Sequence, residues 1–243
     1  MTQKIAIVLA AGKGSRMKSN IPKPLHIVDG KTMIYTLVEK LFHSDLFEKI
    51  LVVVGTESNG IRNNLDEFKS MIVYIIQKEQ LGTGHAVMCC QNYLKAYRNH
   101  MSLILFADCP LLTVDTMNFI VKNDGHCIAC ICKKENPFGN GRILLDKDGF
   151  IINSIEEKDC TPEQKEIKLV NVGIYYIKNS LIIANINKIK NDNSQKEYYL
   201  PDLMMILIEQ GYHIVPKLLQ NPNELINVNT QLDLQIANGV RRF

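Results

Sequence analysis

Two glycines and two basic residues near the start of the chain could together bind a phosphate group. Residues 9–24 read Leu-Ala-Ala-Gly-Lys-Gly-Ser-Arg-Met-Lys-Ser-Asn-Ile-Pro-Lys-Pro, directly after an apolar run at residues 5–9. Gly12 and Gly14 allow backbone N–H groups to approach an anion closely. Arg16 and Lys23 add positive charge where phosphate charge would lie. The segment therefore predicts a site for the phosphates of a nucleoside triphosphate.

This segment differs from the two best-known glycine-rich phosphate motifs. A Walker A loop needs Gly-Lys followed by Ser or Thr, whereas Gly14 is followed by Ser15 and Arg16. The dinucleotide-binding fingerprint needs a third glycine, and Met17 stands in its place. A tight turn with incidental basic residues is the alternative interpretation, but the Pro-Lys-Pro sequence at residues 22–24 favours a phosphate site.

An aspartate follows another apolar run, at residues 102–106. Ligands of parallel α/β sheets bind at the carboxyl ends of the strands, so Asp108 should face the same crevice as the glycine segment. A lone aspartate at a strand end is also a common turn former. Beside a phosphate site, a magnesium ligand is the better interpretation, because Mg²⁺ prefers one or two protein oxygens with phosphate oxygens and water.

The segment Gln77-Lys-Glu-Gln-Leu-Gly-Thr-Gly-His-Ala86 has the residues needed to contact a base. The amides of Gln77 and Gln80 can hydrogen-bond a pyrimidine edge, and Gly82 and Gly84 let the backbone approach a ligand. A side-chain amide can turn either its oxygen or its nitrogen to a base, so Gln77 alone does not distinguish uracil from cytosine. An ordinary glycine-rich loop before a helix is the alternative.

The order of the predicted elements brings these segments to one edge of a sheet. Through residue 135, β-rich runs alternate with helical patterns, which is typical of an α/β fold with a parallel sheet flanked by helices. We expect strands at residues 4–9, 49–54, 71–76, 102–106 and 126–132. We expect helices at residues 33–42, 60–68, 84–97 and 114–122, the last with Thr113 as its N-cap.

After residue 135 the pattern changes to a β-rich region. Two strands at residues 142–145 and 150–156 predict a hairpin, and Thr161-Pro-Glu-Gln164 predicts a capping box at a helix start. The remaining expected elements are a strand at 169–177, a helix at 180–186, a mobile loop at 188–196, a helix at 201–210, a strand at 214–218 and a last helix from Thr230.

The composition limits the classes of function. With 243 residues, 46% of them hydrophobic, the chain can bury a full core as one domain. A net charge of +3 is too small to indicate a nucleic acid or an anionic membrane as a partner. No run is long enough to span a bilayer, and the first strand begins at once, so we expect no signal peptide. Seven cysteines, an odd number, favour a reducing cytoplasm.

Three of those cysteines, Cys127, Cys130 and Cys132, form the one close cluster. A structural zinc site needs four ligands around one ion, and no nearby residues complete the set. Because alternate residues of a strand face opposite sides, these three side chains should not converge. Buried structural thiols are the better interpretation.

Taken together, the three segments resemble a known family, the sugar-nucleotide pyrophosphorylases. The resemblance is closest to the N-terminal uridyltransferase domain of the bifunctional N-acetylglucosamine-1-phosphate uridyltransferase/glucosamine-1-phosphate acetyltransferases, and it extends over essentially the whole chain. Residues 9–17 with Pro22-Lys23 form the family signature, with serine in place of the usual threonine, and residues 80–86 match the uridyltransferase branch. Further matches lie at residues 136–142, 155–159, 171–173, 195–199 with Asp202, and 228–229.

The resemblance implies a Rossmann-like nucleotidyltransferase fold of the glycosyltransferase-A-like kind, with a mostly parallel central sheet and a small β-rich sugar-binding lobe. We expect a single domain, with a nucleotide-binding part at residues 1–135, a sugar-binding part at 136–229 and a C-terminal helix at 230–243. The bifunctional enzymes continue into a left-handed β-helix that carries the acetyltransferase activity and forms trimers. Since this chain stops at Phe243, we expect neither, although another homo-oligomer is compatible with the sequence.

The resemblance also implies roles for individual residues. Arg16, Lys23 and Asp108 would be catalytic, and Asp108 and Asn229 would hold Mg²⁺. The expected nucleotide-binding residues are Leu9, Ala10, Ala11, Gly12, Gln77, Gln80, Gly82 and Thr83. The expected sugar-binding residues are Thr83, Gly141, Glu156, Asn171, Tyr199 and Asn229. His85 is expected to have a structural role at its helix start, because a phosphate nucleophile needs no general base.

The activity that the resemblance implies is formation of UDP-N-acetylglucosamine and pyrophosphate from UTP and N-acetylglucosamine-1-phosphate. Phe106-Ala107 stands where the family usually has Tyr-Gly, and this difference bears on nucleotide selectivity. Two alternatives stay open. One is a related enzyme with another substrate pair, such as UTP or dTTP with glucose-1-phosphate, or CTP with an alcohol phosphate. The other is a non-catalytic regulatory subunit, which would commonly lack Arg16, Lys23 or Asp108.

Overall fold

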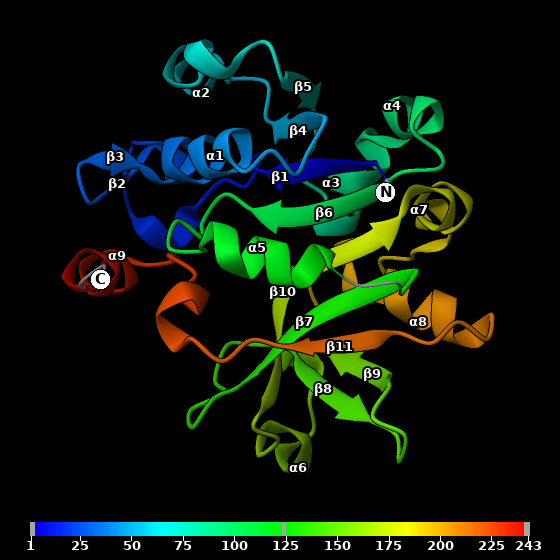
Figure 1. The fold of residues 1–243 in the computed structure, drawn as a ribbon. Coiled ribbons are helices and arrows are strands. Elements are labelled where there is room, and N and C mark those ends of the chain that lie inside the picture. Colours follow the sequence, from blue (N-terminus) through cyan, green and yellow to red (C-terminus); the bar gives the residue numbers. More distant parts are fainter. Residues whose placement is uncertain (1–2, 123–124, 241–243) are drawn as a thin grey trace.

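The computed structural model describes residues 3–122 and 125–240, and a nine-stranded sheet forms its centre (Figure 1). The strand order is β11-β7-β10-β6-β1-β4-β5, and β8 and β9 extend the sheet from β10. The strands are β1 (Lys4–Leu9), β4 (Lys49–Val54), β5 (Ile72–Ile76), β6 (Met101–Phe106), β7 (Cys127–Lys133), β8 (Arg142–Leu145), β9 (Ile151–Ile155), β10 (Leu169–Lys178) and β11 (Val215–Leu218). A separate ribbon pairs β2 (Ile27–Val28) with β3 (Lys31–Thr32).

Helices cover both faces of the sheet, as a parallel sheet requires. They are α1 (Met33–His43), α2 (Asn59–Asn64), α3 (Thr83–Cys89), α4 (Gln91–Ala96), α5 (Val114–Val121), α6 (Pro162–Lys165), α7 (Asn179–Asn185), α8 (Pro201–Glu209) and α9 (Gln231–Gly239). One buried cluster joins β1 to α1 and α5 through residues such as Val8, Leu37 and Met117. A second joins the opposite face of β1 to α3, α7 and α8 through Ile7, Val87 and Leu203. Burial on both faces explains the continuous apolar strands in the sequence.

Four neighbouring strands, in the order β6-β1-β4-β5, run parallel to one another. The chain passes from β1 to β4 and β5 on one side and then returns to place β6 on the other side of β1. The strand order therefore reverses between β1 and β6. Such a switch point is where open α/β sheets bind ligands, outside the carboxyl ends of the strands.

The expectation of a mostly parallel sheet is confirmed, and these four strands form its parallel part. The sequence pattern predicts no direction for β10. β10 lies antiparallel between β6 and β7, so β7 does not pair with β6. β11 then adds parallel to β7 at the sheet edge. Apolar runs identify strands but not their neighbours, because the pairing of a strand depends on tertiary contacts that the pattern does not contain.

Several boundaries also differ from the sequence prediction. The helix expected at residues 84–97 is divided at Cys90, whose N–H bonds to the Val87 carbonyl oxygen at 3.0 Å, three residues back. The helix expected at 60–68 ends at Asn64 and continues as a separate 3-10 turn. The N-cap at Thr113 and the capping box at Thr161 are confirmed. The last helix, expected from Thr230, begins at Gln231 with Thr230 as its N-cap.

The cysteine cluster behaves as strand alternation predicts. Cys127 packs in the core on one face of the sheet, and Cys130 and Cys132 pack on the other. Burial raises the pKa of the Cys127 thiol to about 12 and also raises the pKa of Cys130. Both thiols are therefore uncharged near neutral pH.

No helix in the described part of the chain has the length and apolar character needed to cross a membrane.

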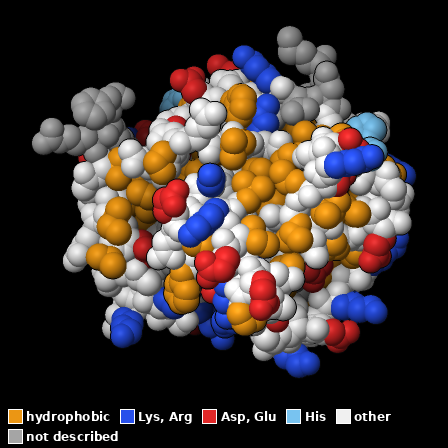
Figure 2. Space-filling model, turned by 90° about the horizontal axis from the view of Figure 1, so that it is seen from below, with side chains coloured by type: hydrophobic (Ala, Val, Ile, Leu, Met, Phe, Trp, Pro, Cys, Tyr) orange, Lys and Arg blue, Asp and Glu red, His pale blue; other side chains and the backbone are white. Residues whose placement is uncertain are grey.

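Figure 2 shows the face seen from below in Figure 1. On this face, hydrophobic side chains gather in a broad central area, and Lys and Arg side chains are interspersed with Asp and Glu.

The glycine loop before α3 is joined to the segment before α8 by backbone hydrogen bonds. Tyr198 N–H donates to the Leu81 carbonyl oxygen at 2.8 Å, and Gly84 N–H donates to the Tyr198 carbonyl oxygen at 2.7 Å. Gly82 adopts a φ of 107°, and a Cβ added there would lie 2.6 Å from the Tyr198 carbonyl oxygen. Only glycine fits, because both the conformation and the space exclude a side chain.

Replacing Gly82 by alanine should therefore lower the free energy of unfolding by about 2 kcal/mol or more. Gly211 is the matched control: its φ is 84°, but nothing lies within 4 Å of an added Cβ. Gly211→Ala should lower the free energy of unfolding by only about 1 kcal/mol, the cost of placing a side chain in the left-handed conformation. Urea unfolding of both variants measures the difference. Equal losses would show that the contact with Tyr198 does not constrain the loop.

Candidate functional site

A cavity of about 640 Å³ opens at the carboxyl ends of β1 and β6, at the switch point of the sheet. It is lined by both halves of the chain. From the first half come Leu9, Ala10, Ala11, Gly12, Arg16, Lys23, Gln77, Gln80, Gly82, Thr83 and Asp108. From the second half come Gly141, Glu156, Asn171 and Asn229. The fold thus brings together the residues assigned to catalysis, nucleotide, metal and sugar, except Tyr199. Gly84, expected to let the backbone approach a ligand, does not line this cavity and lies against Tyr198 instead.

The glycine segment and the lysine that follows it are in direct contact. Gly14 has a φ of 62°, and a Cβ added to it would lie 2.6 Å from the Lys23 Cβ. Arg16 lies on a 3-10 turn, Ser15–Met17, that Gly14 begins. Gly14 therefore both starts the turn that carries Arg16 and lets Lys23 approach.

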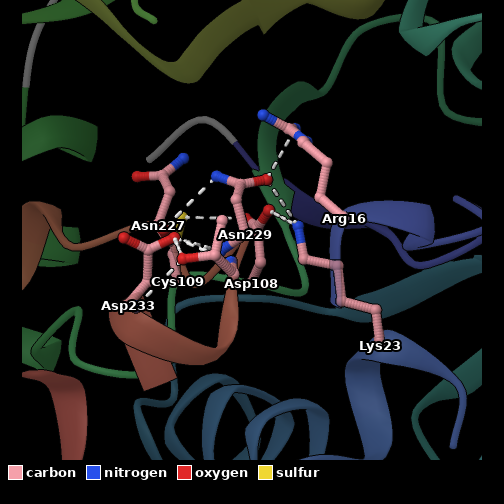
Figure 3. Close-up of polar contacts among 8 residues, drawn as sticks. Arg16, Lys23, Asp108, Cys109, Asn227, Asn229 and Asp233 are labelled. Atoms are coloured by element: carbon pink, nitrogen blue, oxygen red, sulfur yellow. Dashed lines mark hydrogen bonds and ion pairs between the residues drawn. The ribbon is translucent and has the colours of Figure 1, made fainter. Parts of the chain in front are cut away.

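Lys23 links Asp108 to Asn229 across the cavity wall (Figure 3). Its ammonium forms an ion pair with Asp108 and donates to the Asn229 Oδ1 at 2.8 Å. Arg16 donates to the same Asn229 oxygen at 2.9 Å. The side chains of Lys23 and Asp108 are only 15% and 13% exposed, so their attraction is weakly screened.

Asn229 is held next to Asp108 by the backbone that precedes α9. Val228 N–H donates to the Asp108 carbonyl oxygen at 2.9 Å. Thr230 then caps α9 in a reciprocal box with Asp233, and the Asp233 carboxylate also accepts from the Asn229 N–H at 3.0 Å. The cap of the last helix therefore fixes a residue of the cavity.

The donor chemistry of Asp108 and Asn229 fits a magnesium ion. A single ammonium contacts a carboxylate oxygen of one and the amide oxygen of the other, so both oxygens can share one cation. Mg²⁺ is usually held by one or two protein oxygens, with phosphate oxygens and water completing the octahedron. Within residues 3–122 and 125–240, no group of three or more His, Cys, Asp or Glu side chains could hold a metal by itself. A cation at this pair would therefore depend on ligands brought by the substrate.

Gln77 closes the opposite end of the cavity. Its side chain is nearly buried, with 3% of its surface exposed. The amide nitrogen lies 3.1 Å from the Gly82 carbonyl oxygen and 3.1 Å from the His85 Nδ1. Gln80 donates to the Gln77 backbone carbonyl oxygen at 3.3 Å. Two glutamines and a glycine loop thus form one connected wall.

Asn171 is oriented by neighbours on its own strand. Its amide nitrogen donates to the Tyr175 hydroxyl at 2.6 Å, and its amide oxygen accepts from the Gly173 N–H at 2.9 Å. The ladder between β10 and β7 is irregular between residues 171 and 175, and both side chains line the cavity. Asn171 is therefore a rigid polar group rather than a free surface residue.

Glu156 lies at the far wall, beside two other acids. Burial raises the pKa of Glu156, and the nearby negative charges of Asp202 and Asp159 raise it further. Burial also raises the pKa of Asp202 to about 6, with a contribution from Asp159. These carboxyl groups thus take up protons more readily than exposed acids do.

Tyr199 lies outside the main cavity. It lines a neighbouring cavity of about 250 Å³, of which Glu156 is also a wall residue. Its hydroxyl accepts a hydrogen bond from Gln195 at 2.7 Å, and its side chain is buried. Tyr199 thus shares a wall with Glu156 in this second cavity and does not line the main one.

The structure adds wall residues that the sequence did not single out for binding. Phe106 and Ala107, noted only as a departure from the family pattern, both line the cavity. The further additions are Lys13, Ser15, Pro24, Ala86, Gly139, Asn140, Val172, Gly173, Tyr175, Glu197 and Asn227. Most are neighbours of predicted residues in the chain. Tyr175 could have been found from the even spacing that places it on the face of Asn171.

A mostly parallel sheet with a cationic, glycine-lined cavity at its switch point defines the class of nucleotide-binding α/β proteins. Comparison with known sequences narrows that class. The sequence profile of the nucleotidyl transferase family matches residues 5–220, and the chain belongs to this family. The resemblance predicted from the motifs is thereby confirmed.

Several curated relatives match the chain from end to end. A protein from Clostridium novyi named bifunctional protein GlmU is 38% identical over 99% of this chain and 52% of its own length. Proteins of the same name from Staphylococcus carnosus and Halalkalibacterium halodurans are 36% and 32% identical, and the alignments cover 53% of each. The chain therefore spans about half the length of the curated relatives it matches.

Solved structures support the fold. A putative glucose-1-phosphate thymidylyltransferase from Bacillus anthracis superposes with a TM-score of 0.77, covering 99% of this chain and 97% of that chain, at 20% identity. A UDP-glucose pyrophosphorylase superposes with a TM-score of 0.76, covering 98% of both chains, at 18% identity. The Rossmann-like nucleotidyltransferase fold expected from the sequence is confirmed.

The position of Lys23 predicts how the site responds to a divalent metal without nucleotide. The ammonium already neutralises Asp108, so Mn²⁺ should bind the free protein weakly. Lys23→Met removes this competing charge and should tighten Mn²⁺ binding about tenfold or more. Electron paramagnetic resonance of a Mn²⁺ titration measures the affinity. Lys13→Met is the control, because Lys13 also lines the cavity. Among the contacts of the described residues, Lys13 makes none with Asp108 or Asn229. Unchanged affinity in Lys23→Met would contradict the prediction.

The raised pKa of Asp202 predicts a pH-dependent stability. In the folded chain its pKa is about 6, above the usual value of 3.8. The folded state therefore binds the proton more tightly, and stability is lost as the pH rises through this window. Asp202→Asn should unfold with a free energy about 1 kcal/mol higher than the wild type at pH 7.5, a gain that shrinks towards pH 4. Urea unfolding at both pH values tests this, with the exposed Asp148→Asn as control. A pH-independent difference would show that Asp202 does not titrate in this way.

Proposed function

We propose that the chain is a uridylyltransferase that forms UDP-N-acetylglucosamine and pyrophosphate from UTP and N-acetylglucosamine-1-phosphate. One observation carries the proposal: residues from the glycine-rich segment 9–24, from the glutamine-containing segment 77–83 and from strand β10, including Asn171, line a single cavity. Each of these segments has its counterpart in the uridyltransferase signature described above, and relatives named bifunctional protein GlmU match 99% of the chain.

The chemistry requires alignment more than acid–base catalysis. A phosphate oxygen of the sugar phosphate attacks the α-phosphorus of UTP, the bond to the β-phosphate breaks, and pyrophosphate leaves from the opposite side. The attacking oxygen is already ionised, so no general base and no covalent enzyme intermediate are needed. The cavity must hold the two phosphates in line and offset their negative charge.

Arg16 and Lys23 provide the positive charge at the reaction centre. We assign Arg16 to the departing pyrophosphate and Lys23 to the phosphates nearest the bond that forms. Preorganised cations act strongly where charge develops in the transition state. Arg16 contacts Asn229, and Lys23 contacts Asp108. These contacts support the assignment, because they hold the two basic side chains at one wall of the cavity before substrate binds.

Asp108 and Asn229 are the residues that would hold Mg²⁺. A bound magnesium ion polarises phosphate oxygens and acts as a template for their orientation. Asp108 supplies the anionic oxygen, and Asn229 supplies a neutral one that the cap of α9 keeps in place.

We assign the β-rich side of the cavity to the amino sugar. Asn171 presents a fixed amide, and Glu156 and Gly141 lie beside it. Thr83 borders both substrates, and its hydroxyl accepts the Leu200 N–H at 3.0 Å. Tyr199 borders this side from the neighbouring cavity that Glu156 also lines.

The proposed reaction is uridylyl transfer, because the residues that line the cavity form a site for that reaction. We propose small-molecule substrates and a cytoplasmic reaction. All seven cysteines are free, which fits a reducing compartment.

A matrix of nucleotides against sugar phosphates, followed by pyrophosphate release, tests the function. UTP with N-acetylglucosamine-1-phosphate should give the highest kcat/KM. UTP or dTTP with glucose-1-phosphate, and CTP with an alcohol phosphate, test the alternative substrate pairs. A higher kcat/KM for another pair would replace the proposed reaction, and binding of nucleotide without turnover would indicate a regulatory subunit.

Two substitutions separate the roles of the two ends of the cavity. Arg16→Ala should lower kcat about 10²–10³-fold, because a transition-state contact is lost. Asn171→Ala should mainly raise KM for the sugar phosphate, roughly tenfold, because one oriented hydrogen bond is lost. The exposed Arg98→Ala controls for loss of positive charge elsewhere. If both cavity variants release pyrophosphate like the wild type, the site is wrongly assigned.

A further inference from the structure

We infer that His85 sets the preference for UTP over CTP by fixing the orientation of the Gln77 amide. This inference rests on the proposed function, because it takes Gln77, predicted from the sequence to contact a pyrimidine base, as the residue that binds the uracil of UTP. It gives a role in substrate choice to a side chain that does not line the cavity.

The first step is the identity of the Gln77 atom that faces Gly82. The contact is 3.1 Å long, and its partner is a backbone carbonyl oxygen. A carbonyl oxygen only accepts hydrogen bonds. The Gln77 atom at this position must therefore be the amide nitrogen, and a hydrogen of that nitrogen points to Gly82.

The second step is the protonation state of His85. The same Gln77 nitrogen lies 3.1 Å from the His85 Nδ1. An amide nitrogen has no lone pair available to accept a hydrogen bond. The Nδ1 must therefore accept, which requires a neutral imidazole with its proton on Nε2.

Together the two contacts use both hydrogens of the Gln77 amide. The amide oxygen is left for a ligand, because no partner for it occurs in the described part of the chain and Gln77 lines the cavity. With 97% of its surface buried (3% exposed), the side chain has little freedom to move elsewhere. Gln77 thus offers a hydrogen-bond acceptor to the base.

An acceptor at this point distinguishes the two pyrimidines. Uracil carries a hydrogen on N3, which the Gln77 oxygen can accept. Cytosine has a lone pair on N3, which would face the oxygen without a proton between them. The orientation of one amide therefore decides which base fits, as long as the amide cannot turn over.

His85 is the side chain that prevents the amide from turning over. A reversed amide would place its oxygen against the Gly82 carbonyl oxygen, a repulsive contact, and against the Nδ1 lone pair, which repels it as long as the imidazole proton stays on Nε2. Gly82 contributes through its backbone, so only the second contact can be removed by substitution. His85 lies in the first turn of α3, with its ring 6.2 Å from the Tyr198 ring, and acts on the base through Gln77. It is a positioning residue.

The test measures dissociation constants of UTP and CTP by calorimetry on the whole chain, without sugar phosphate. The wild type should prefer UTP. His85→Leu removes the acceptor and should lower the ratio of CTP to UTP dissociation constants roughly threefold to tenfold, the range expected for one hydrogen bond. His85→Asn can place its side-chain oxygen near the former Nδ1 and should keep most of the preference. His126→Leu, at an exposed histidine on another element, is the matched control.

Three results would overturn the inference. They are a wild type that binds CTP as tightly as UTP, an unchanged ratio in His85→Leu, and an equal loss of preference in the Leu and Asn variants. Nitrogen NMR of the wild type gives a measurement that does not depend on any variant folding. The His85 ring should show an unprotonated Nδ1, and a protonated Nδ1 would also overturn the inference.

The outcome is separable from that of the proposed function. Pyrophosphate release reports the reaction, whereas the binding ratio reports the base contact alone. A UTP preference that falls in His85→Leu would support the inference even if N-acetylglucosamine-1-phosphate were not the second substrate. Efficient release with UTP and an unchanged ratio would support the reaction and reject the role of His85.

Discussion

The parallel pairing of β1 with β6 is the constraint on which the site depends. The register opposes Leu9 to Phe106, and the Ala107 N–H continues the ladder to the Leu9 carbonyl oxygen at 3.0 Å. Both strands therefore end at the same level. The glycine segment leaves one strand end and Asp108 leaves the other, and a shift of one residue in this register would turn the side chains of one strand to the opposite face. The close packing of β1 side chains in the two core clusters opposes such a shift.

Distant parts of the chain complete the site by attaching to this pair of strand ends. The segment before α9 pairs its backbone with Asp108, and the segment before α8 pairs its backbone with the glycine loop. β10 inserts beside β6 and brings Asn171 to the same cavity. Most polar residues that define the cavity thus come from places where the chain leaves regular structure, whereas Asn171 lies within β10. This division allows a fixed scaffold to hold a densely polar surface.

Much of this arrangement could be predicted from the sequence, and the parts that could not have physical reasons. Apolar runs located β1 and β4 to the residue, and threonines before helices located the caps, because these signals are local. The antiparallel insertion of β10 depends on tertiary pairing, so the pattern could not reveal it. Tyr199 lines a separate cavity whose walls come from segments far apart in the chain, and the local pattern does not contain that arrangement. The Gln77 orientation needed the positions of Gly82 and His85 around one amide, and spacing along the chain does not contain that geometry.

The backbone clamp between the glycine loop and the segment before α8 has a consequence for motion. Gly84 and Tyr198 are far apart in the chain, yet each hydrogen bond that protects one of them also anchors the other segment. Their amide protons should therefore become accessible to solvent in one shared opening event rather than in two separate ones. A molecule that stiffens either segment would slow exchange in both, so the wall that faces the base and the approach to the sugar behave as one mechanical unit.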